Sequence, residues 1–162
     1  MSWPELHAPS PHFGTSPHER RGVCFHHTAK SFGATLAWMQ APASRVSYHT
    51  VIASDGTRAR LVEDHHVAWH AGVSAFQGRI NANDFLLGLA FAGDTYAAPL
   101  TAAQLESALD WLAPRWLTHR WSLAWMTDHR QIAPGRKDDL APAEWSRLLA
   151  AIATRFGAGK MR

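Results

Sequence analysis

The chain has 162 residues, of which 46% are hydrophobic and 18% charged, and its net charge is +3. This composition excludes a disordered chain and fits one globular domain, which we assign to residues 1–162. It also excludes a membrane-spanning protein, because no apolar run approaches the ~20 residues of a transmembrane helix. Lys and Arg form no cluster longer than Arg20-Arg21, which argues against a nucleic-acid partner.

Cys24 is the only cysteine, so no disulfide can form within the chain, and the fold does not require an oxidising compartment. The opening residues, MSWPELHAPSPHFG, lack the basic and apolar regions of a signal peptide. We therefore expect a protein that is cytoplasmic as synthesised. We also expect it to be a monomer.

Short strands and one short helix are expected in the first half of the chain. Residues 1–20, rich in Pro, Ser and His, predict an extended arm packed on the domain. The elements expected after this arm are a strand at 21–27, a helix at 33–41, and strands at 46–53, 57–62 and 66–72. Asp55-Gly56 predicts a hairpin turn between the second and third of these strands, because Asp-Gly tolerates the positive φ angles of tight turns.

The second half of the chain predicts one interior strand and two longer helices. Residues 73–84 indicate a polar loop, and the apolar run 86–93 indicates a strand covered on both faces. Thr101 and Gln104 form a capping-box pattern at the start of a helix that Pro114 should end or kink. The remaining elements are a strand at 123–129 and a last helix that begins at Pro142. Together they predict an α/β fold, with a central mixed β-sheet of about five or six strands flanked by helices.

The segment DHRQIAPGRKDDL, residues 128–140, is typical of half a metal site. A Pro-Gly pair lies between His129 and Asp139 and breaks any helix, so a loop must fold these two side chains together. Histidine and aspartate are both ligands that zinc accepts. Lys137 would add a fixed positive charge beside them.

The missing ligand should come from another strand that ends at the same edge of the sheet. The best candidate is FHHT, residues 25–28, where the strand expected at 21–27 ends. Adjacent residues of a strand point to opposite faces, so only one of His26 and His27 can face the site.

Five segments, in this order, carry a resemblance to a known family: FHHTA, VSYHTVIASDG, AWHAGVSAFQGR, the Asn-Asp-x-x-x-Gly run at 83–88, and HRQIAPGRKDD. Together they resemble the zinc-dependent N-acetylmuramoyl-L-alanine amidases. This family includes cytosolic anhydro-muramyl-peptide amidases of cell-wall recycling, phage lysozymes of the amidase type, and peptidoglycan recognition proteins. The resemblance spans roughly residues 21–152.

The resemblance implies a role for six residues. It implies one zinc ion per chain, held by His26, His129 and Asp139. It places Lys137 beside the reacting carbonyl and makes Tyr48 a catalytic candidate. It implies that the substrate groove is lined by His70, and we expect Trp69 and Asn83 to contact substrate as well. Two histidines and one carboxylate leave zinc an open fourth position, where water can bind.

One residue departs from the family pattern. Many members have Gly-Ile-Glu-Leu where this chain has Gly88-Leu89-Ala90-Phe91. That glutamate is the general base of the recycling enzymes, and an alanine cannot accept the proton. Some phage-type members also lack it and rely on the tyrosine and lysine. The departure concerns the proton-transfer step and leaves the metal ligands intact.

Several histidines and carboxylates have simpler interpretations. Asp138 is the competitor of Asp139 as a ligand, or a group beside the site. His27 and His49 are expected to pack or to form structural hydrogen bonds. The run Glu63-Asp64-His65-His66 could hold a second metal, but a solvated turn is the better interpretation.

The function implied by the resemblance is hydrolysis of the amide bond between the lactyl group of N-acetylmuramic acid and L-alanine, in peptidoglycan or muropeptides. The alternative from another class is a peptidoglycan-binding receptor that has lost turnover. Ala90, in place of the glutamate, is the observation that suggests it. A different zinc hydrolase is a third possibility, since fold and metal do not fix the substrate. Cell lysis or non-classical release could bring the protein to the cell wall.

Overall fold

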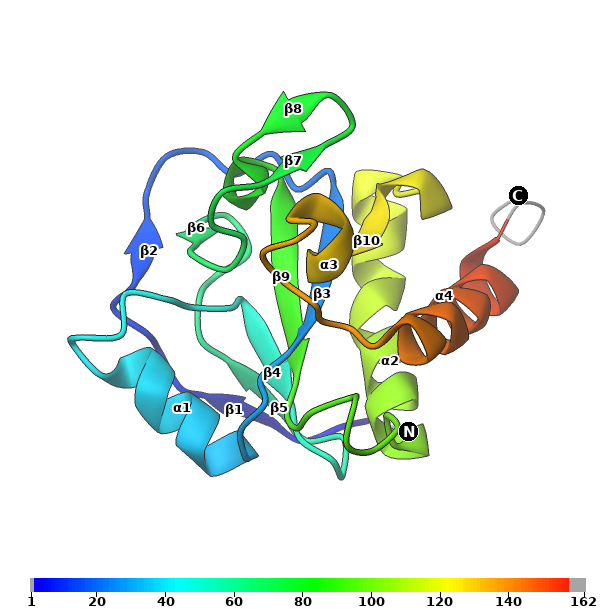
Figure 1. Cartoon of the computed structure of the whole chain (residues 1–162), viewed down its shortest axis with the longest axis horizontal. Helices are drawn as coiled ribbons and strands as arrows, with labels where there is room; N and C mark the ends of the chain where they lie inside the picture. The colour runs from blue at the N-terminus through cyan, green and yellow to red at the C-terminus, as the bar shows by residue number, and fades with distance from the viewer. Residues whose placement is uncertain (1, 158–162) are drawn as a thin grey trace.

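A six-stranded sheet forms the centre of the computed structural model, which describes residues 2–157 (Figure 1). Met1 of the predicted arm and residues 158–162 of the predicted domain lie outside the described residues. In spatial order the strands are β1 (Glu5–His7), β5 (Arg58–Arg60), β4 (Thr50–Ile52), β9 (Leu86–Phe91), β3 (Gly22–His27) and β10 (Met126–Asp128). The sheet is mixed, because β4 and β5 are antiparallel while the other neighbours are parallel. The predicted α/β class is confirmed.

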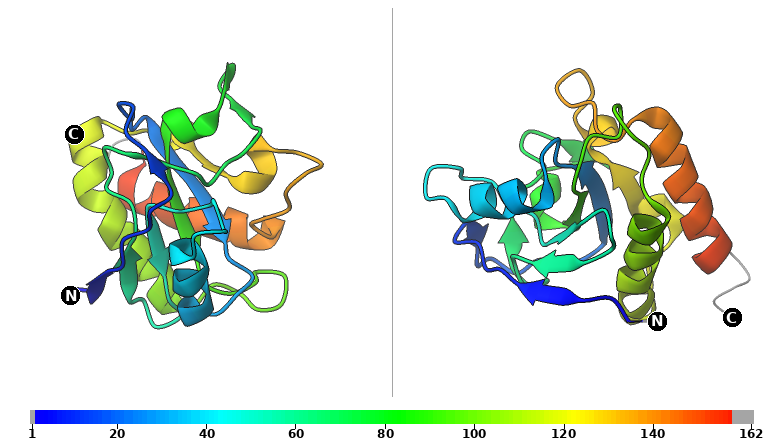
Figure 2. Two further views of the ribbon diagram at one scale, coloured as in Figure 1. Left: turned by 90° about the vertical axis from the view of Figure 1, so that its left-hand side faces the viewer. Right: turned by 90° about the horizontal axis from the view of Figure 1, so that it is seen from below.

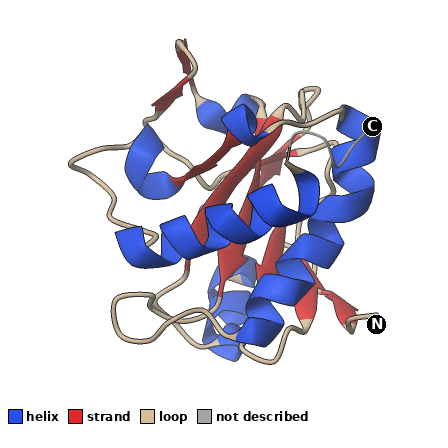
Figure 3. Cartoon of the chain, turned by 90° about the vertical axis from the view of Figure 1, so that its right-hand side faces the viewer, coloured by secondary structure: helices blue, strands red, loops and turns tan. Residues whose placement is uncertain are grey.

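The two central strands are buried on both faces, as the apolar run at 86–93 predicts. Every residue of β9 is buried, and β3 is buried up to His26. One face of these strands, with Phe25 and Leu89, packs on α2 (Ala102–His119) and α4 (Pro142–Phe156), which cross it in Figure 3. The other face lies towards α1 (Phe32–Gln40) and the loops, so that helices flank both sides of the sheet (Figure 2).

The N-terminal arm is part of the sheet system. Its strand β1 lies parallel to β5 at the sheet edge, and β2 (Phe13–Gly14) pairs with β6 (Val67–Ala68). The remaining short elements are β7 (Ala75–Phe76), β8 (Arg79–Ile80), η1 (Ala82–Asp84), η2 (Leu123–Trp125) and α3 (His129–Ile132). The polar loop predicted at 73–84 is therefore wrong, because β7 and β8 pair as a small hairpin. Two-residue strands carry too short a pattern to be recognised from sequence.

The helix does not end at Pro114, one of the two outcomes predicted there, but continues to His119. A proline inside a helix costs about 3 kcal/mol or more, because it removes one hydrogen bond and crowds the preceding turn. Trp111, Leu112 and Trp116 on either side of it are buried in the core, and this burial offsets the cost. The predicted capping box is confirmed at Thr101. No helix among the described residues is long and apolar enough to cross a membrane.

Several histidines belong to the core, and His49 is the clearest example. Its side chain is fully buried, and its Nδ1 accepts a hydrogen bond from the Gly88 amide at 3.0 Å while its Nε2 donates to the His66 carbonyl at 2.8 Å. Burial, helped by neighbouring His18, lowers the pKa of His49 to about 3. The structural role expected for His49 agrees with this geometry. The imidazole is therefore neutral in the folded protein at neutral pH.

This burial predicts that the protein loses stability in mild acid. Below pH 6.5 an unfolded histidine binds a proton, whereas His49 in the folded protein stays neutral until about pH 3. Between pH 7 and 5, His49 alone should lower the free energy of unfolding by about 2 kcal/mol. Urea unfolding of the wild type and of His49→Gln at both pH values checks this. Equal pH dependence in the two proteins would contradict it.

Candidate metal centre and active site

His26 reaches the site because it lies at the carboxyl end of β3. Side chains alternate along this strand, so Phe25 packs with α2 and α4 and the His27 ring contacts Thr95, while His26 faces the opposite side of the sheet. His26 is fully buried and pairs in register with Ala90 of β9. The prediction that only one of the two adjacent histidines faces the site agrees with this arrangement.

A loop folds His129 and Asp139 together, as the Pro-Gly break predicts. His129 is the first residue of α3, directly after β10, and its helix is capped by the carboxylate of Asp128. The chain then turns back, and the Asp139 carbonyl accepts a hydrogen bond from the Arg130 amide at 2.7 Å. The Asp128 carboxylate also accepts from the Leu140 amide at 3.1 Å, so the same aspartate fixes both ends of the loop.

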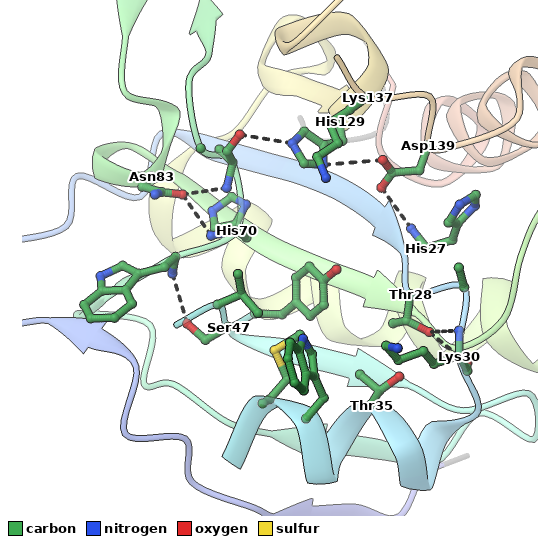
Figure 4. Close-up of a pocket in the computed structure, with 18 of the residues that line it drawn as sticks. His27, Thr28, Lys30, Thr35, Ser47, His70, Asn83, His129, Lys137 and Asp139 are labelled. Carbon is green, nitrogen blue, oxygen red and sulfur yellow. Dashed lines mark hydrogen bonds and ion pairs between the residues drawn. The ribbon is translucent and has the colours of Figure 1, made fainter. Parts of the chain in front are cut away.

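Three potential ligand atoms converge where these segments meet, and Figure 4 shows two of the three side chains, His129 and Asp139. The Nδ1 atoms of His26 and His129 are 3.0 Å apart. The carboxylate of Asp139 lies 3.5 Å from Nδ1 of His26 and 3.4 Å from Nδ1 of His129. Ligands of a tetrahedral zinc ion with bonds of 2.0–2.1 Å are spaced by ~3.3 Å, which agrees with these separations.

The hydrogen bonds behind the two rings leave both Nδ1 atoms without a proton. Nε2 of His129 lies 3.0 Å from the Ala71 carbonyl, which can only accept, so this nitrogen carries the hydrogen. Nε2 of His70 likewise donates to the Leu86 carbonyl at 3.0 Å. Nδ1 of His70 must then accept, and Nε2 of His26 donates to it at 2.9 Å. Each neutral imidazole has one N–H, so Nδ1 of His26 and of His129 present lone pairs.

Two bare nitrogens and a carboxylate that face one another call for a cation between them. Burial, with neighbouring His129, lowers the pKa of His26 to about 4, so the His26 ring carries no second proton at neutral pH. The nitrogen and oxygen donor set is one that zinc accepts, and three protein ligands leave a position for water. These residues therefore fit a zinc ion.

A second group of potential ligands lies behind the first. Cys24, His26 and His70 each have a potential ligand atom within 4.8 Å of the others, and Nε2 of His26 lies 2.9 Å from Nδ1 of His70. Those two nitrogens already share a hydrogen, and burial raises the pKa of the Cys24 thiol well above its ordinary value. A neutral thiol beside an occupied hydrogen bond is a poor metal site. We therefore favour the group of His26, His129 and Asp139.

The candidate metal centre opens into a cavity of about 490 Å³. His129 and Asp139 lie on its wall, as does Lys137 from the same loop (Figure 4). Across the cavity are Trp38 at the end of α1 and Arg45 in the loop after it. The cavity therefore combines the potential ligands, cationic groups and an aromatic wall.

Tyr48 is also on the cavity wall, and its ring centroid lies 5.0 Å from that of His26. Burial, with the nearby Asp139 carboxylate, raises the pKa of Tyr48 above its ordinary value. The phenol therefore holds its proton at neutral pH. This suits a proton donor and disfavours a base.

Asp138, the competitor of Asp139 as a ligand, does not join the cluster. It is exposed, and its carbonyl accepts a hydrogen bond from the Tyr96 hydroxyl at 2.7 Å. Asp138 and Asp139 are the carboxylates on the cavity wall. Ala90 is fully buried opposite His26 on the neighbouring strand, in a cluster with residues such as Val51 and Met39. The chain therefore has a methyl group where a glutamate would reach towards the candidate metal centre.

The three residues expected to contact substrate all line the cavity. Trp69 is held by its amide, which donates to the Ser47 hydroxyl at 2.9 Å. Asn83 uses its side-chain oxygen to accept from the amides of His70 and Ala71, at 3.0 and 2.8 Å. Both ring nitrogens of His70 are engaged by protein groups. The substrate-contacting role stays a prediction for all three.

Sequence reasoning missed the groups that hold the Asp139 loop in place. The amide of His27 donates to Asp139 at 3.2 Å, so both histidines of FHHT serve the site. Nδ1 of His27 accepts from the Thr95 hydroxyl at 2.7 Å, and that hydroxyl accepts from the Ala141 amide at 2.8 Å. Backbone partners leave no pattern of residue types, so these contacts have little signal in the sequence.

The run at residues 63–66 does not form a second metal site. The groups in the described residues that could hold a metal do not include it. Asp64 pairs with Arg115 at 2.7 Å, and Glu63 lies 3.6 Å from Arg60. These carboxylates already have cationic partners, which agrees with the interpretation as a turn.

Comparison with known proteins identifies relatives of the chain. A family model described as N-acetylmuramoyl-L-alanine amidase matches residues 16–142. The 1,6-anhydro-N-acetylmuramyl-L-alanine amidase AmpD of Salmonella typhimurium is 40% identical over 111 residues, 67% of this chain and 58% of that protein. The N-acetylmuramoyl-L-alanine amidase AmiD of Escherichia coli is 30% identical over 142 residues, 78% of this chain and 51% of that protein. The chain thus matches little more than half the length of these relatives.

Solved structures agree with these sequence relatives. A crystal structure of a selenomethionine AmpD derivative has a TM-score of 0.78 at 27% identity, covering 93% of this chain and 96% of that chain. AmiD from Escherichia coli, in complex with anhydro-N-acetylmuramic acid-L-Ala-D-gamma-Glu-L-Lys, has a TM-score of 0.72 at 26% identity, covering 85% and 60%. The family is generally zinc-dependent, which matches the donor set described above. The chain belongs to the N-acetylmuramoyl-L-alanine amidase family.

Proposed function

We propose that this chain is a zinc-dependent amidase that hydrolyses the bond between the lactyl group of N-acetylmuramic acid and L-alanine, in peptidoglycan or muropeptides. The observation that carries the proposal is the convergence of His26, His129 and Asp139, the last two of which line a cavity, in a member of this family. Relatives named for this activity, and the AmiD complex with a muropeptide, support the substrate class.

One zinc ion per chain would be held by Nδ1 of His26, Nδ1 of His129 and the carboxylate of Asp139. When bound, zinc supplies a water that is activated for attack at neutral pH and polarises the carbonyl that is attacked. The protein side chains must orient the substrate, stabilise the negative charge on the carbonyl oxygen and donate a proton to the leaving amine. For that task the cavity offers Lys137 and Tyr48.

Lys137 would stabilise the negative charge that develops on the carbonyl oxygen. It shares the cavity wall with Asp139, two residues further along the same loop. A fixed positive charge acts most strongly where charge appears during the reaction, because the protein need not reorganise. The adjacent Arg136 is occupied elsewhere, since its guanidinium donates to the Ala71 carbonyl at 2.6 Å.

Tyr48 would give a proton to the leaving amine of L-alanine. Its hydroxyl is protonated at neutral pH, so a proton is available at the cavity wall when the amine departs. Ala90 provides no carboxylate base, so Tyr48 is the protein group that we assign to proton transfer. Trp69 and Asn83 on the same wall are proposed to contact the substrate.

The receptor alternative explains Ala90 but not the rest of the site. A binding module needs the groove alone, whereas this chain also keeps three converging ligand atoms and a partly buried tyrosine beside them. We therefore favour the enzyme. A monomeric state and a cytoplasmic location as synthesised remain proposals, which sedimentation analysis and cell fractionation would test.

Zinc removal should abolish the activity. The zinc-loaded protein, mixed with soluble anhydro-muropeptides or with intact sacculi, should release peptides with a free L-alanine amino terminus, detected by mass spectrometry. Chelation should stop this release, and added zinc should restore it, because the attacking water depends on the metal. Release that persists without metal, or no release from either substrate, would contradict the proposal.

Tyr48→Phe should lower the rate by about 10²- to 10⁴-fold, the range for loss of a general acid or base. The variant keeps the ring against His26 and removes only the hydroxyl. The circular-dichroism spectrum and the zinc content of the variant, both expected to equal those of the wild type, control for misfolding and metal loss. The measurement is the steady-state rate of each protein, wild type and variant, on the same muropeptide. An unchanged rate for Tyr48→Phe would refute its role as proton donor.

Lys137→Met should lower the rate by about 10²- to 10³-fold, the usual cost of losing one group that stabilises an oxyanion. Lys30 lines the same cavity, so Lys30→Met controls for a general loss of positive charge. The same rate measurement separates the two. Equal losses for the two variants would show that Lys137 acts only through the overall charge of the cavity.

A further inference from the structure

The dipeptide His70–Ala71 lies behind both histidines of the candidate metal centre. We propose that it holds them in the orientation and protonation state that bind the metal, and that His70 is a positioning residue. This inference rests on the proposed zinc site. It gives His70 a function different from contact with the substrate.

The contact to His26 runs through the His70 ring. Nε2 of His26 is 2.9 Å from Nδ1 of His70, and Nε2 of His70 is 3.0 Å from the Leu86 carbonyl. Because that carbonyl only accepts, His70 is obliged to donate there and to accept from His26. His26 is fully buried, so no solvent water takes the place of His70. The proton of His26 is therefore kept on Nε2, away from the metal position.

The contact to His129 runs through the next residue along the chain. The Ala71 carbonyl accepts from Nε2 of His129 at 3.0 Å and from the Arg136 guanidinium at 2.6 Å. One side chain and one carbonyl, adjacent in sequence, thus fix the outer nitrogens of both ligands. Any shift of this dipeptide would turn both rings.

Two further contacts fix the dipeptide itself. The Asn83 side-chain oxygen accepts from the amides of His70 and Ala71, at 3.0 and 2.8 Å (Figure 4). The His70 ring lies against β9 at Gly88, where an added Cβ would be 2.5 Å from Cγ of that ring. Gly88 is therefore the residue that leaves room for the ring.

Position 70 needs one acceptor and one donor at the end of a side chain. Histidine provides both, and so does the amide of glutamine, whereas leucine provides neither. Removing a group that orients a metal-binding histidine typically lowers the metal affinity 10- to 100-fold. The expected loss of zinc affinity can therefore be measured without an activity assay.

The test is zinc affinity, measured by competition with a chromophoric chelator on the full-length protein. His70→Leu should bind zinc about 10- to 100-fold more weakly than the wild type, while His70→Gln should keep most of the affinity. Long-range ¹H–¹⁵N spectra of the zinc-loaded wild type should show the ring hydrogen of His26 on Nε2. In His70→Leu, the signal of that hydrogen should shift or exchange rapidly.

His49→Leu is the matched control, because it removes another fully buried histidine that is not part of the potential ligand group. It should bind zinc like the wild type. If His70→Leu does not fold, Asn83→Ala carries the test, since it frees both amides without changing a ring, and it too should weaken zinc binding. Wild-type affinity in His70→Leu or in this substitute, or an equal loss in His49→Leu, would overturn the inference. A wild type that binds no zinc would instead overturn the proposed function.

Discussion

The repulsion among three buried acceptors is the constraint on which the active site depends. The Nδ1 atoms of His26 and His129, 3.0 Å apart, and the carboxylate of Asp139 would push one another away without a cation between them. Hydrogen bonds from behind hold these groups in place. These hydrogen bonds orient the three groups towards one point, so that binding a metal ion there would need little reorganisation.

The fold and the main site residues could be predicted because they leave residue patterns. An apolar run indicated the interior strand β9, and a Pro-Gly break between His129 and Asp139 indicated the loop that joins them. The supporting contacts could not be predicted in the same way. They use the Ala71 carbonyl and the His27 amide, which every residue type possesses. Pro114 does not end its helix, because the burial of Trp111, Leu112 and Trp116 outweighs a local rule.

Ala90 and Tyr48 show how the site departs from a carboxylate-assisted design. The methyl group of Ala90 is buried beside His26, and the ring of Tyr48 contacts the same histidine from the cavity. A phenol that holds its proton can assist the departure of the amine but cannot take a proton from water. The proton transfer that we assign to a protein side chain is thus the one from Tyr48 to the leaving amine.

The separation of the ligands along the chain bears on when the site can form. His26 and His129 are 103 residues apart in sequence and meet only because β3 and β10 are neighbours in the sheet. Closing a loop of this length is entropically costly, and the many contacts of a formed sheet must offset that cost. Metal cannot guide the early steps of folding, as it does in a zinc finger whose ligands are close in sequence. It would join a scaffold that the chain has already completed.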